Sequence, residues 1–242
     1  MTEAVYQEDL PREEEVEEVQ CPPSDLFSEE PPLETDFHRE QVDLLIRLLK
    51  GWWRDREDVY ISGNLTIYYN QQQLKSRDFR GPDFFVVLGT EKKERKSWVV
   101  WAEGGKYPNL IVEILSEKTA NVDKGLKKQL YQDTFRTPEY FWFDPITLEL
   151  QGFHLVNGIY QPISPTENHL LWSEQLALYL GVSDSKLRFF TPEEQLIPSA
   201  EERADLAQQR AEAAERALSE EKAKSERLAA RLRELGIDPN DP

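Results

Sequence analysis

The sequence predicts an α/β fold of the α+β kind, with a mixed central sheet flanked by helices and an extended C-terminal helix. A helix with one apolar face comes first, at about 38–55, and short apolar strands follow it. A second helix, at about 121–136, separates two of these strands, which favours a mixed sheet between layers of helices. The chain then ends in a long charged segment with helical periodicity.

The charge of the chain is concentrated at its start. The 242 residues have a net charge of −17, and residues 1–37 alone hold 13 acidic residues and one basic residue. We predict that this acidic leader is disordered, because so polar a segment buries too little surface to offset its ordering entropy. Residues 38–200 hold 22 acidic and 20 basic residues, so charge neither supports nor excludes a nucleic-acid partner for the domain.

Composition excludes several classes of protein. No run approaches the ~18 apolar residues of a membrane span, and the first residues lack the basic-then-apolar order of a signal peptide. The single cysteine, Cys21, excludes an intramolecular disulfide framework and a four-cysteine zinc site. We therefore expect a soluble, cytoplasmic protein with no membrane partner.

The first helix and the strands that follow it account for the N-terminal half of the domain. Apolar residues of the helix recur at the three-and-four spacing of one buried face: Val42, Leu45, Ile46, Leu49, Trp52 and Trp53. β-branched and aromatic residues predict one strand or two short strands at 59–69. Apolar runs predict buried strands at 83–88, 109–115 and 140–145, and the polar stretch 91–98 predicts a loop.

The helix at 121–136 carries the residues that matter most for chemistry. Its pattern predicts that Leu126 and Leu130 anchor it on the sheet, which leaves Lys127 and Tyr131 at the boundary of the buried face. Beyond it, Asn157-Gly158 predicts a hairpin within 148–163.

A short helix near 173–180 and a closing strand near 187–190 complete the domain at 38–200. In the charged helix, 201–235, ten positions follow the alternating three-four step of heptad core sites, and eight of them are Ala or Leu. This pattern predicts a coiled coil that pairs subunits. The alternative is a solvated single helix, because alanine buries little surface. Gly236 and Pro239 end the helix and leave a tail at 236–242.

Two carboxylates lie among apolar strand residues. Asp83 opens the run 83–88, and Glu113 interrupts the run 109–115. A buried carboxylate is costly unless it is paired, hydrogen-bonded or bound to a metal. The alternative for Glu113 is a place on the solvated face of its strand. Lys127 follows Glu113 by fourteen residues, and a lysine stem can lie along such a boundary and deliver its ammonium to a cleft.

Two strand carboxylates and one lysine form the set needed for metal-assisted cleavage of a phosphodiester. Asp83, Glu113 and the main-chain carbonyl of Ile114 would supply the hard oxygen ligands that Mg²⁺ prefers, with Mn²⁺ as an alternative ion. The ion would polarise the phosphate and help generate hydroxide. Lys127 would orient the water or offset the charge that develops on the phosphorane. Lys124 and Lys128 are rivals for that role.

Other groups of residues give weaker signals. The histidines lack metal-ligand spacing, so we expect none of them to be a metal ligand. For His38, near a helix start, the alternatives are to cap that helix or to bridge toward the site. A basic cluster at 92–96 either contacts phosphates or forms a solvated loop: Lys92, Lys93, Arg95 and Lys96.

Several strings together resemble the Uma-two family of endonuclease-like proteins. They are GPD (81–83), PNLIVEILS (108–116), DKGLK (123–127) with Tyr131, TPEYFWFDP (137–145), LRFFTPEEQLIP (187–198) and the final LRELGIDP, together with His38. The resemblance covers about residues 35–200 and the extreme C-terminus. It implies a PD-(D/E)XK restriction-endonuclease-like core, with Asp83 as the aspartate of the PD motif and Glu113 as the second acidic residue.

The chain departs from the pattern of the larger superfamily at Leu115, where a lysine is expected. In Uma-like proteins that lysine lies on the following helix, here as Lys127. The resemblance implies a divalent-metal-dependent endonuclease acting on DNA. The competing hypothesis is a catalytically inactive nuclease fold that serves as a binding or assembly module and forms a homo-oligomer, such as a dimer, through the C-terminal helix. A third hypothesis is that the acidic leader mimics DNA and occludes a groove, so that its removal would strengthen DNA binding.

Overall fold

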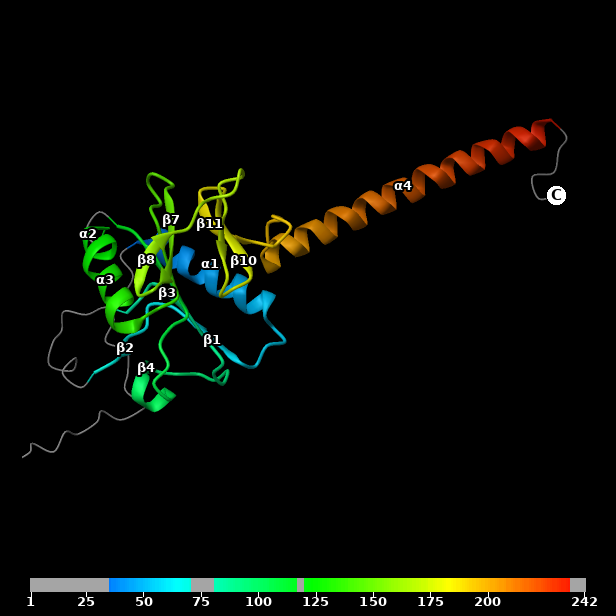
Figure 1. Cartoon of the computed structure of the whole chain (residues 1–242). Helices are drawn as coiled ribbons and strands as arrows, with labels where there is room; N and C mark the ends of the chain where they lie inside the picture. Colours follow the sequence, from blue (N-terminus) through cyan, green and yellow to red (C-terminus); the bar gives the residue numbers. More distant parts are fainter. Residues whose placement is uncertain (1–34, 71–80, 117–119, 236–242) are drawn as a thin grey trace, which may run out of the picture.

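The computed structural model describes residues 35–70, 81–116 and 120–235, and a six-stranded sheet lies at its centre (Figure 1). The strands, in spatial order, are β1 (Val59–Ser62), β3 (Phe84–Leu88), β5 (Leu110–Ile114), β6 (Glu139–Phe143), β7 (Leu150–Val156) and β8 (Ile159–Pro162). β5 and β6 run parallel, and the other neighbours pair antiparallel. The sheet is therefore mixed, as the sequence predicts.

A helical crossover joins the two parallel strands, since a parallel pair requires a long connection. It consists of α2 (Ala120–Val122), a π-helical stretch (Asp123–Lys127), α3 (Lys128–Leu130) and a second π-helical stretch (Tyr131–Phe135). We call this segment, 120–135, the crossover helix. It covers one face of the sheet, where aromatic residues such as Tyr131 and Tyr140 pack together.

The opposite face of the sheet is covered by α1 (Asp36–Trp52) and by a small second sheet. Val42, Leu45 and Leu49 of α1 are buried there, as their spacing predicts, whereas Trp52 is 46% exposed. The second sheet contains β9 (Leu171–Ser173), β10 (Leu178–Ser183) and β11 (Lys186–Phe190), in the order β11-β10-β9.

Two short strands extend the crossover side of the core. β2 (Ile67–Tyr68) pairs in parallel with β4 (Trp98–Val99), which runs into a 3-10 turn at Val100–Glu103. β1 and β2 are the two short strands that 59–69 predicts. Residues 91–97 form the loop that leads into β4.

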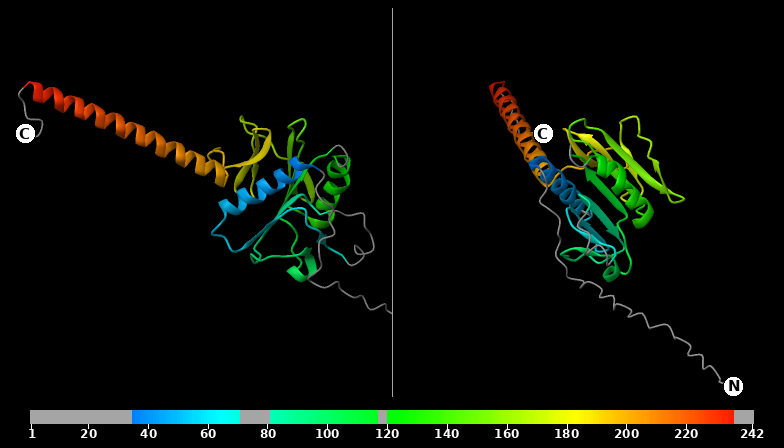
Figure 2. Two further views of the ribbon diagram at one scale, coloured as in Figure 1. Left: turned by 180° about the vertical axis from the view of Figure 1, so that it is seen from behind. Right: turned by 90° about the vertical axis from the view of Figure 1, so that its left-hand side faces the viewer.

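The C-terminal helix α4 (Ala200–Glu234) projects from the domain (Figures 1 and 2). Its first turn is fixed in two ways. Ser199 and Glu202 form a capping box, and Arg188 donates two hydrogen bonds to Glu202, of 2.9 and 2.7 Å. All residues of α4 are exposed or half-buried.

The structure confirms the predicted fold class: a mixed sheet, flanking helices and a long C-terminal helix. The expectation of a helix near 173–180 is wrong, because this segment contributes β9, a turn and β10. The first helix also begins two residues earlier than predicted, since Thr35 caps α1 and accepts a hydrogen bond from the main chain of His38. The predicted disorder of the leader, up to residue 34, and the tail 236–242 lie outside the described residues. Among the described residues, no helix is both long and apolar enough to cross a membrane.

Candidate active site

The register of two antiparallel strands brings Asp83 and Glu113 together. Phe84 of β3 pairs with Val112 of β5, so the next position in the same register sets Asp83 opposite Glu113. Side chains that are directly opposed across a strand pair lie on the same face of a sheet. Here that face carries the crossover helix. Asp83 lies just before β3, where the backbone turns, and its side chain is 14% exposed.

Main-chain groups of the two strands hold both carboxylates in place. The Ile114 N–H donates to Oδ2 of Asp83 at 2.8 Å, and the Asp83 N–H donates to Oε2 of Glu113 at 3.3 Å. Gly63 lies directly against the backbone of Asp83, where any side chain would collide with the Asp83 carbonyl. This close approach explains why a glycine interrupts the apolar run at this point.

The crossover helix delivers two further groups to Glu113. Lys127 Nζ lies 3.1 Å from Oε2 of Glu113, and the hydroxyl of Tyr131 donates to Oε1 at 2.7 Å. Glu113 has no exposed surface, and each of its two oxygens accepts a hydrogen bond from the protein, as a buried polar group requires. The prediction that Glu113 and Lys127 meet is thus correct as geometry, and a place for Glu113 on a solvated face is excluded.

The face of the crossover helix that points to the sheet differs from the one predicted. Leu126 is 72% exposed, whereas Asp123, Lys127 and Tyr131 are buried. These three residues and Phe135 follow an i, i+4 spacing, and the two π-helical stretches keep this stripe directed at the sheet. Leu126 points away from the sheet because Lys127 and Tyr131 face it and contact Glu113 of β5. Apolar periodicity does not reveal such polar partners.

Asp123 is a third carboxylate at this site. Its Oδ1 lies 2.9 Å from Lys127 Nζ, and only 1% of the residue is exposed. The sequence does contain a signal for it, because Asp123 and Lys127 have the i, i+4 spacing of a helical ion pair.

The two rival lysines point elsewhere. Lys124 Nζ lies 4.0 Å from the ring centroid of Trp142, and Lys128 Nζ lies 3.4 Å from that of Phe153. Both are cation–π contacts outside the carboxylate cluster. Of the three candidates, Lys127 is therefore the one whose ammonium contacts Glu113 and Asp123.

His38 reaches the same cluster from α1. Its Nε2 lies 3.0 Å from Oδ2 of Asp83, and the residue is 7% exposed. His38 thus bridges toward the site, which its position near a helix start suggested. Asp83, Glu113, Lys127, Asp123 and His38 are what we call the carboxylate cluster.

The cluster shifts the proton affinities of its members. Burial raises the pKa of Glu113 well above its ordinary value, with repulsion from Asp83 and Asp123 adding to the effect despite Lys127. For Asp83, burial is outweighed by His38, Lys127 and the Ile114 N–H, so its pKa is lowered. Burial alone would lower the pKa of Lys127, but Glu113 and Asp123 raise it, so the ammonium stays charged at neutral pH.

The donor set fits a divalent cation. The buried Glu113 and Asp123 both contact the Lys127 ammonium, and the partly buried Asp83 lies beside Glu113, so these carboxylates provide negative charge that a cation would offset. Two buried atoms of the site, His38 Nε2 and Asp123 Oδ1, each have an ion-pair partner. Among the described residues, neither atom has a hydrogen bond of regular geometry. In the part of the chain that the structure describes, no three His, Cys, Asp or Glu side chains converge as a metal cage. Mg²⁺ does not require one, because it is usually held by one or two carboxylates, waters and substrate phosphates.

The structure therefore brings together the predicted residues Asp83, Glu113 and Lys127, and it places the main chain of Ile114 beside Asp83 through its N–H. Whether the Ile114 carbonyl serves as a metal ligand stays a prediction. Sequence reasoning assigned no role to Asp123 or Tyr131, which hold Lys127 and Glu113.

Comparisons with known proteins identify the family of the chain. No curated protein matches the chain. A solved structure, titled "putative nuclease belonging to DUF820 from Anabaena variabilis ATCC 29413", is similar over 64% of this chain and 82% of that one, with 15% identity and a TM-score of 0.46. The model of the Uma2 family, described as "Putative restriction endonuclease", matches residues 10–188, which is more than half of the chain. The chain therefore belongs to the Uma2 family of restriction-endonuclease-like proteins.

Proposed function

We propose that this protein is a divalent-metal-dependent endonuclease that hydrolyses phosphodiester bonds of DNA. The observation that carries the proposal is the meeting of Asp83, Glu113 and Lys127, which come from three separate segments of the chain. Membership of the Uma2 family supports the same reading. The reaction class follows from the donor set, because carboxylates, an ammonium and a divalent ion suit phosphoryl chemistry.

Each residue has a distinct role in this proposal. Asp83 and Glu113 hold Mg²⁺ or Mn²⁺, with the Ile114 carbonyl as a further oxygen ligand. When bound, such an ion polarises the phosphate and lowers the pKa of its water. Lys127 orients the attacking water and offsets charge on the phosphate oxygens in the transition state.

The other members of the site act through these three. Tyr131 fixes the orientation of the Glu113 carboxylate, and Asp123 holds the Lys127 ammonium at the end of its flexible stem. His38 fixes Asp83 from the opposite layer of the domain. Such supporting partners commonly change metal affinity or activity by 10–100-fold when they are removed.

The proposal is tested with purified protein, a plasmid DNA substrate, and Mg²⁺ or Mn²⁺. Asp83→Asn and Glu113→Gln remove the charge of each carboxylate with little change of shape, and Lys127→Met removes the ammonium. We expect each to lower the cleavage rate by about 10² or more. Lys124→Met and Lys128→Met are matched controls on the same helix and should cleave at nearly the wild-type rate.

Two results would overturn the proposal. One is cleavage by Asp83→Asn and Glu113→Gln at the wild-type rate, which would indicate a contaminating nuclease. The other is a wild-type protein that binds neither ion by calorimetry at millimolar concentration.

That second result would favour the alternative, an inactive nuclease fold that serves as an assembly module. The observation in its favour is α4, which projects from the domain with exposed leucines such as Leu218 and Leu228. A homodimer formed through this helix is compatible with either function. Metal binding, rather than oligomeric state, therefore distinguishes the two.

A further inference from the structure

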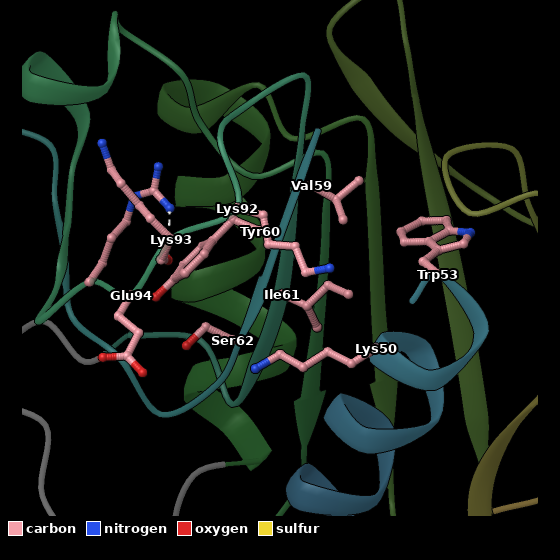
Figure 3. Close-up of a pocket in the computed structure, with 10 residues that line it drawn as sticks. Lys50, Trp53, Val59, Tyr60, Ile61, Ser62, Lys92, Lys93 and Glu94 are labelled. Carbon is pink, nitrogen blue, oxygen red and sulfur yellow. Dashed lines mark hydrogen bonds between the residues drawn. The ribbon is translucent and has the colours of Figure 1, made fainter. Parts of the chain in front are cut away.

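A second feature of the domain lies along the outer edge of β1, the first strand of the central sheet. There a pocket of about 480 Å³ is bounded by the last turn of α1, by β1 itself and by the loop after β3 (Figure 3). The lining residues that matter here are Lys50, Ser62, Lys92, Lys93, Glu94 and Arg95. The pocket includes three of the four residues of the basic cluster at 92–96.

The pocket is basic within an acidic chain. Four of its lining residues are cationic and Glu94 is the single acidic one, whereas the whole chain has a net charge of −17. Lys50 is far in sequence from the basic cluster at 92–96, and the fold brings these positive charges to one pocket. A local excess of positive charge in an acidic chain favours an anionic ligand.

Arg95 serves the structure of the pocket rather than a ligand. Its side chain is 5% exposed and donates two hydrogen bonds to the carboxylate of Glu103, of 2.6 and 2.9 Å. It also donates to the carbonyls of Glu91 and Lys93 and lies over the Tyr60 ring. These contacts fix the conformation of the loop.

Lys92 is also engaged by the protein. Its ammonium has three acceptors, the carbonyls of Arg54 and Arg56 and the carboxylate of Glu57, at 3.1 to 3.2 Å. Because an ammonium has three donors, this lysine fastens the loop to the segment after α1.

Lys50 and Lys93 are the cations that remain available to a ligand. Lys50 is exposed in the last turn of α1 and extends toward the Ser62 end of β1 (Figure 3). Lys93 is half exposed, and its ion pair is with Glu91, which is 73% exposed. An ion pair at such a surface is worth ~0–1 kcal/mol, so a phosphate can replace the carboxylate as the partner of Lys93.

The Ser62 end of the pocket adjoins the carboxylate cluster. Ser62 is followed by Gly63, which packs against the backbone of Asp83, and the Asn64 N–H donates to the Asp83 carbonyl at 3.1 Å. From Val59 to Ser62 the strand extends ~10 Å, at ~3.3 Å per residue. That length equals about three base-pair steps, which rise by ~3.4 Å each along the duplex axis.

We propose that the β1-edge pocket binds the sugar–phosphate backbone of the DNA that flanks the cleaved bond, with Lys50 and Lys93 as its phosphate contacts. This inference rests on the proposed function for the identity of the ligand. The pocket holds the substrate strand beside Asp83, and Arg95 and Lys92 keep the loop in the shape that binding requires.

The experiment measures binding separately from cleavage. A short fluorescein-labelled DNA duplex is titrated with full-length protein in EDTA, and anisotropy is followed at several salt concentrations. The Lys50→Ala/Lys93→Ala double variant should bind about an order of magnitude more weakly and lower the slope of log K against log salt by about two. The control is Lys222→Ala/Lys224→Ala, which removes the same charge from α4 and should leave affinity and slope unchanged.

The outcomes distinguish this inference from the proposed function. If the double variant binds with the wild-type affinity and salt slope, the pocket is not a DNA site and the inference is overturned, even if the wild type cleaves DNA. If the double variant loses affinity and its thermal melting is unchanged, the inference is supported. A wild type that binds through the pocket but cleaves nothing with Mg²⁺ or Mn²⁺ would contradict the endonuclease proposal alone.

Discussion

His38 Nε2 lies 3.0 Å from Oδ2 of Asp83, a contact that links the first helix of the domain to a carboxylate at the start of β3. The position of His38 follows from the helix start, because its main-chain N–H donates to the capping hydroxyl of Thr35. The Ile114 N–H donates to the same oxygen of Asp83. An ion-pair contact from one layer and a main-chain hydrogen bond from another therefore meet at one carboxylate oxygen.

We expect His38→Ala to weaken Mn²⁺ binding by about 10–100-fold, because a metal-holding carboxylate loses affinity when its orienting partner is removed. Isothermal titration calorimetry of the purified protein measures this. His154→Ala, on β7, is the control and should bind Mn²⁺ like the wild type. Equal affinity in the His38 variant would show that Asp83 needs no orienting partner.

Lys127 supplies the next prediction, since its ammonium neutralises two buried carboxylates. Lys127→Met should lower the free energy of unfolding by about 3–5 kcal/mol, because Glu113 and Asp123 are then left without their cation. Urea unfolding at neutral pH measures the loss. Lys124→Met, on the exposed side of the same helix, should cost less than about 1 kcal/mol.

Adding Glu113→Gln to the Lys127→Met chain should restore part of that stability, because the second substitution removes one of the stranded charges. If the two losses simply add, the Lys127–Glu113 contact is not the cause of the destabilisation.

The sequence was sufficient to place both strand carboxylates. Asp83 opens one apolar run, and Glu113 stands out because an aliphatic residue is expected at its position in the other. The two runs pair in one sheet. Their direct opposition depends on strand register, which is set by the packing of both strands and not by either run alone.

The buried face of the crossover helix could not be predicted in the same way. Apolar periodicity favours Leu126 as an anchor, yet this residue is 72% exposed and Lys127 is buried instead. Lys127 is buried because its ammonium contacts Glu113, fourteen residues earlier, and the hydroxyl of Tyr131 contacts the same carboxylate. A buried stripe of polar residues can therefore be predicted only when the strand that pairs with it is known.

This difference leads to a paired prediction. Tyr131→Phe keeps the ring but removes the hydrogen bond to Glu113, and it should cost about 1–3 kcal/mol of unfolding free energy. Leu126→Ala should cost less than about 0.5 kcal/mol, because the side chain is already in water. Thermal or urea unfolding of the two variants makes the comparison, and a larger loss for Leu126→Ala would contradict the observed helix face.

The turn between β9 and β10 depends on another distant carboxylate, which explains why local pattern predicted a helix there. Glu139 of β6 accepts hydrogen bonds from the hydroxyl of Ser173 and from the N–H groups of Glu174 and Gln175. These bonds hold the turn onto the central sheet. Residues 173–180 alone contain no sign of them.

Burial raises the pKa of Glu139 from 4.5 to about 7, against the opposing effect of these donors. In the folded state Glu139 then binds a proton at pH values where the unfolded chain has released it. The stability that this provides is complete below about pH 4.5 and is lost as the pH rises through 7. Between pH 4.5 and a pH above 7, we expect the unfolding free energy of the wild type to fall by about 3 kcal/mol relative to that of Glu139→Gln. This figure follows from ~1.4 kcal/mol for each unit of pKa difference between the folded and unfolded states. Urea unfolding at a series of pH values measures it, and parallel curves for the two proteins would disprove it.

The C-terminal helix gives the last prediction, which concerns assembly. α4 has 35 residues, and Leu218 and Leu228 of its heptad series are 59% and 58% exposed. A single helix gains nothing from leucines in water, whereas a second copy would bury them along a shared seam. Sedimentation equilibrium of the full-length protein should therefore show a dimer, and Leu218→Glu/Leu228→Glu should shift it to monomer. Ala223→Glu/Ala230→Glu adds the same charge on the opposite side of the helix and should leave the dimer intact. A wild-type monomer at high concentration would mean that α4 is a solvated single helix, and any pairing of subunits would then have to use the domain itself.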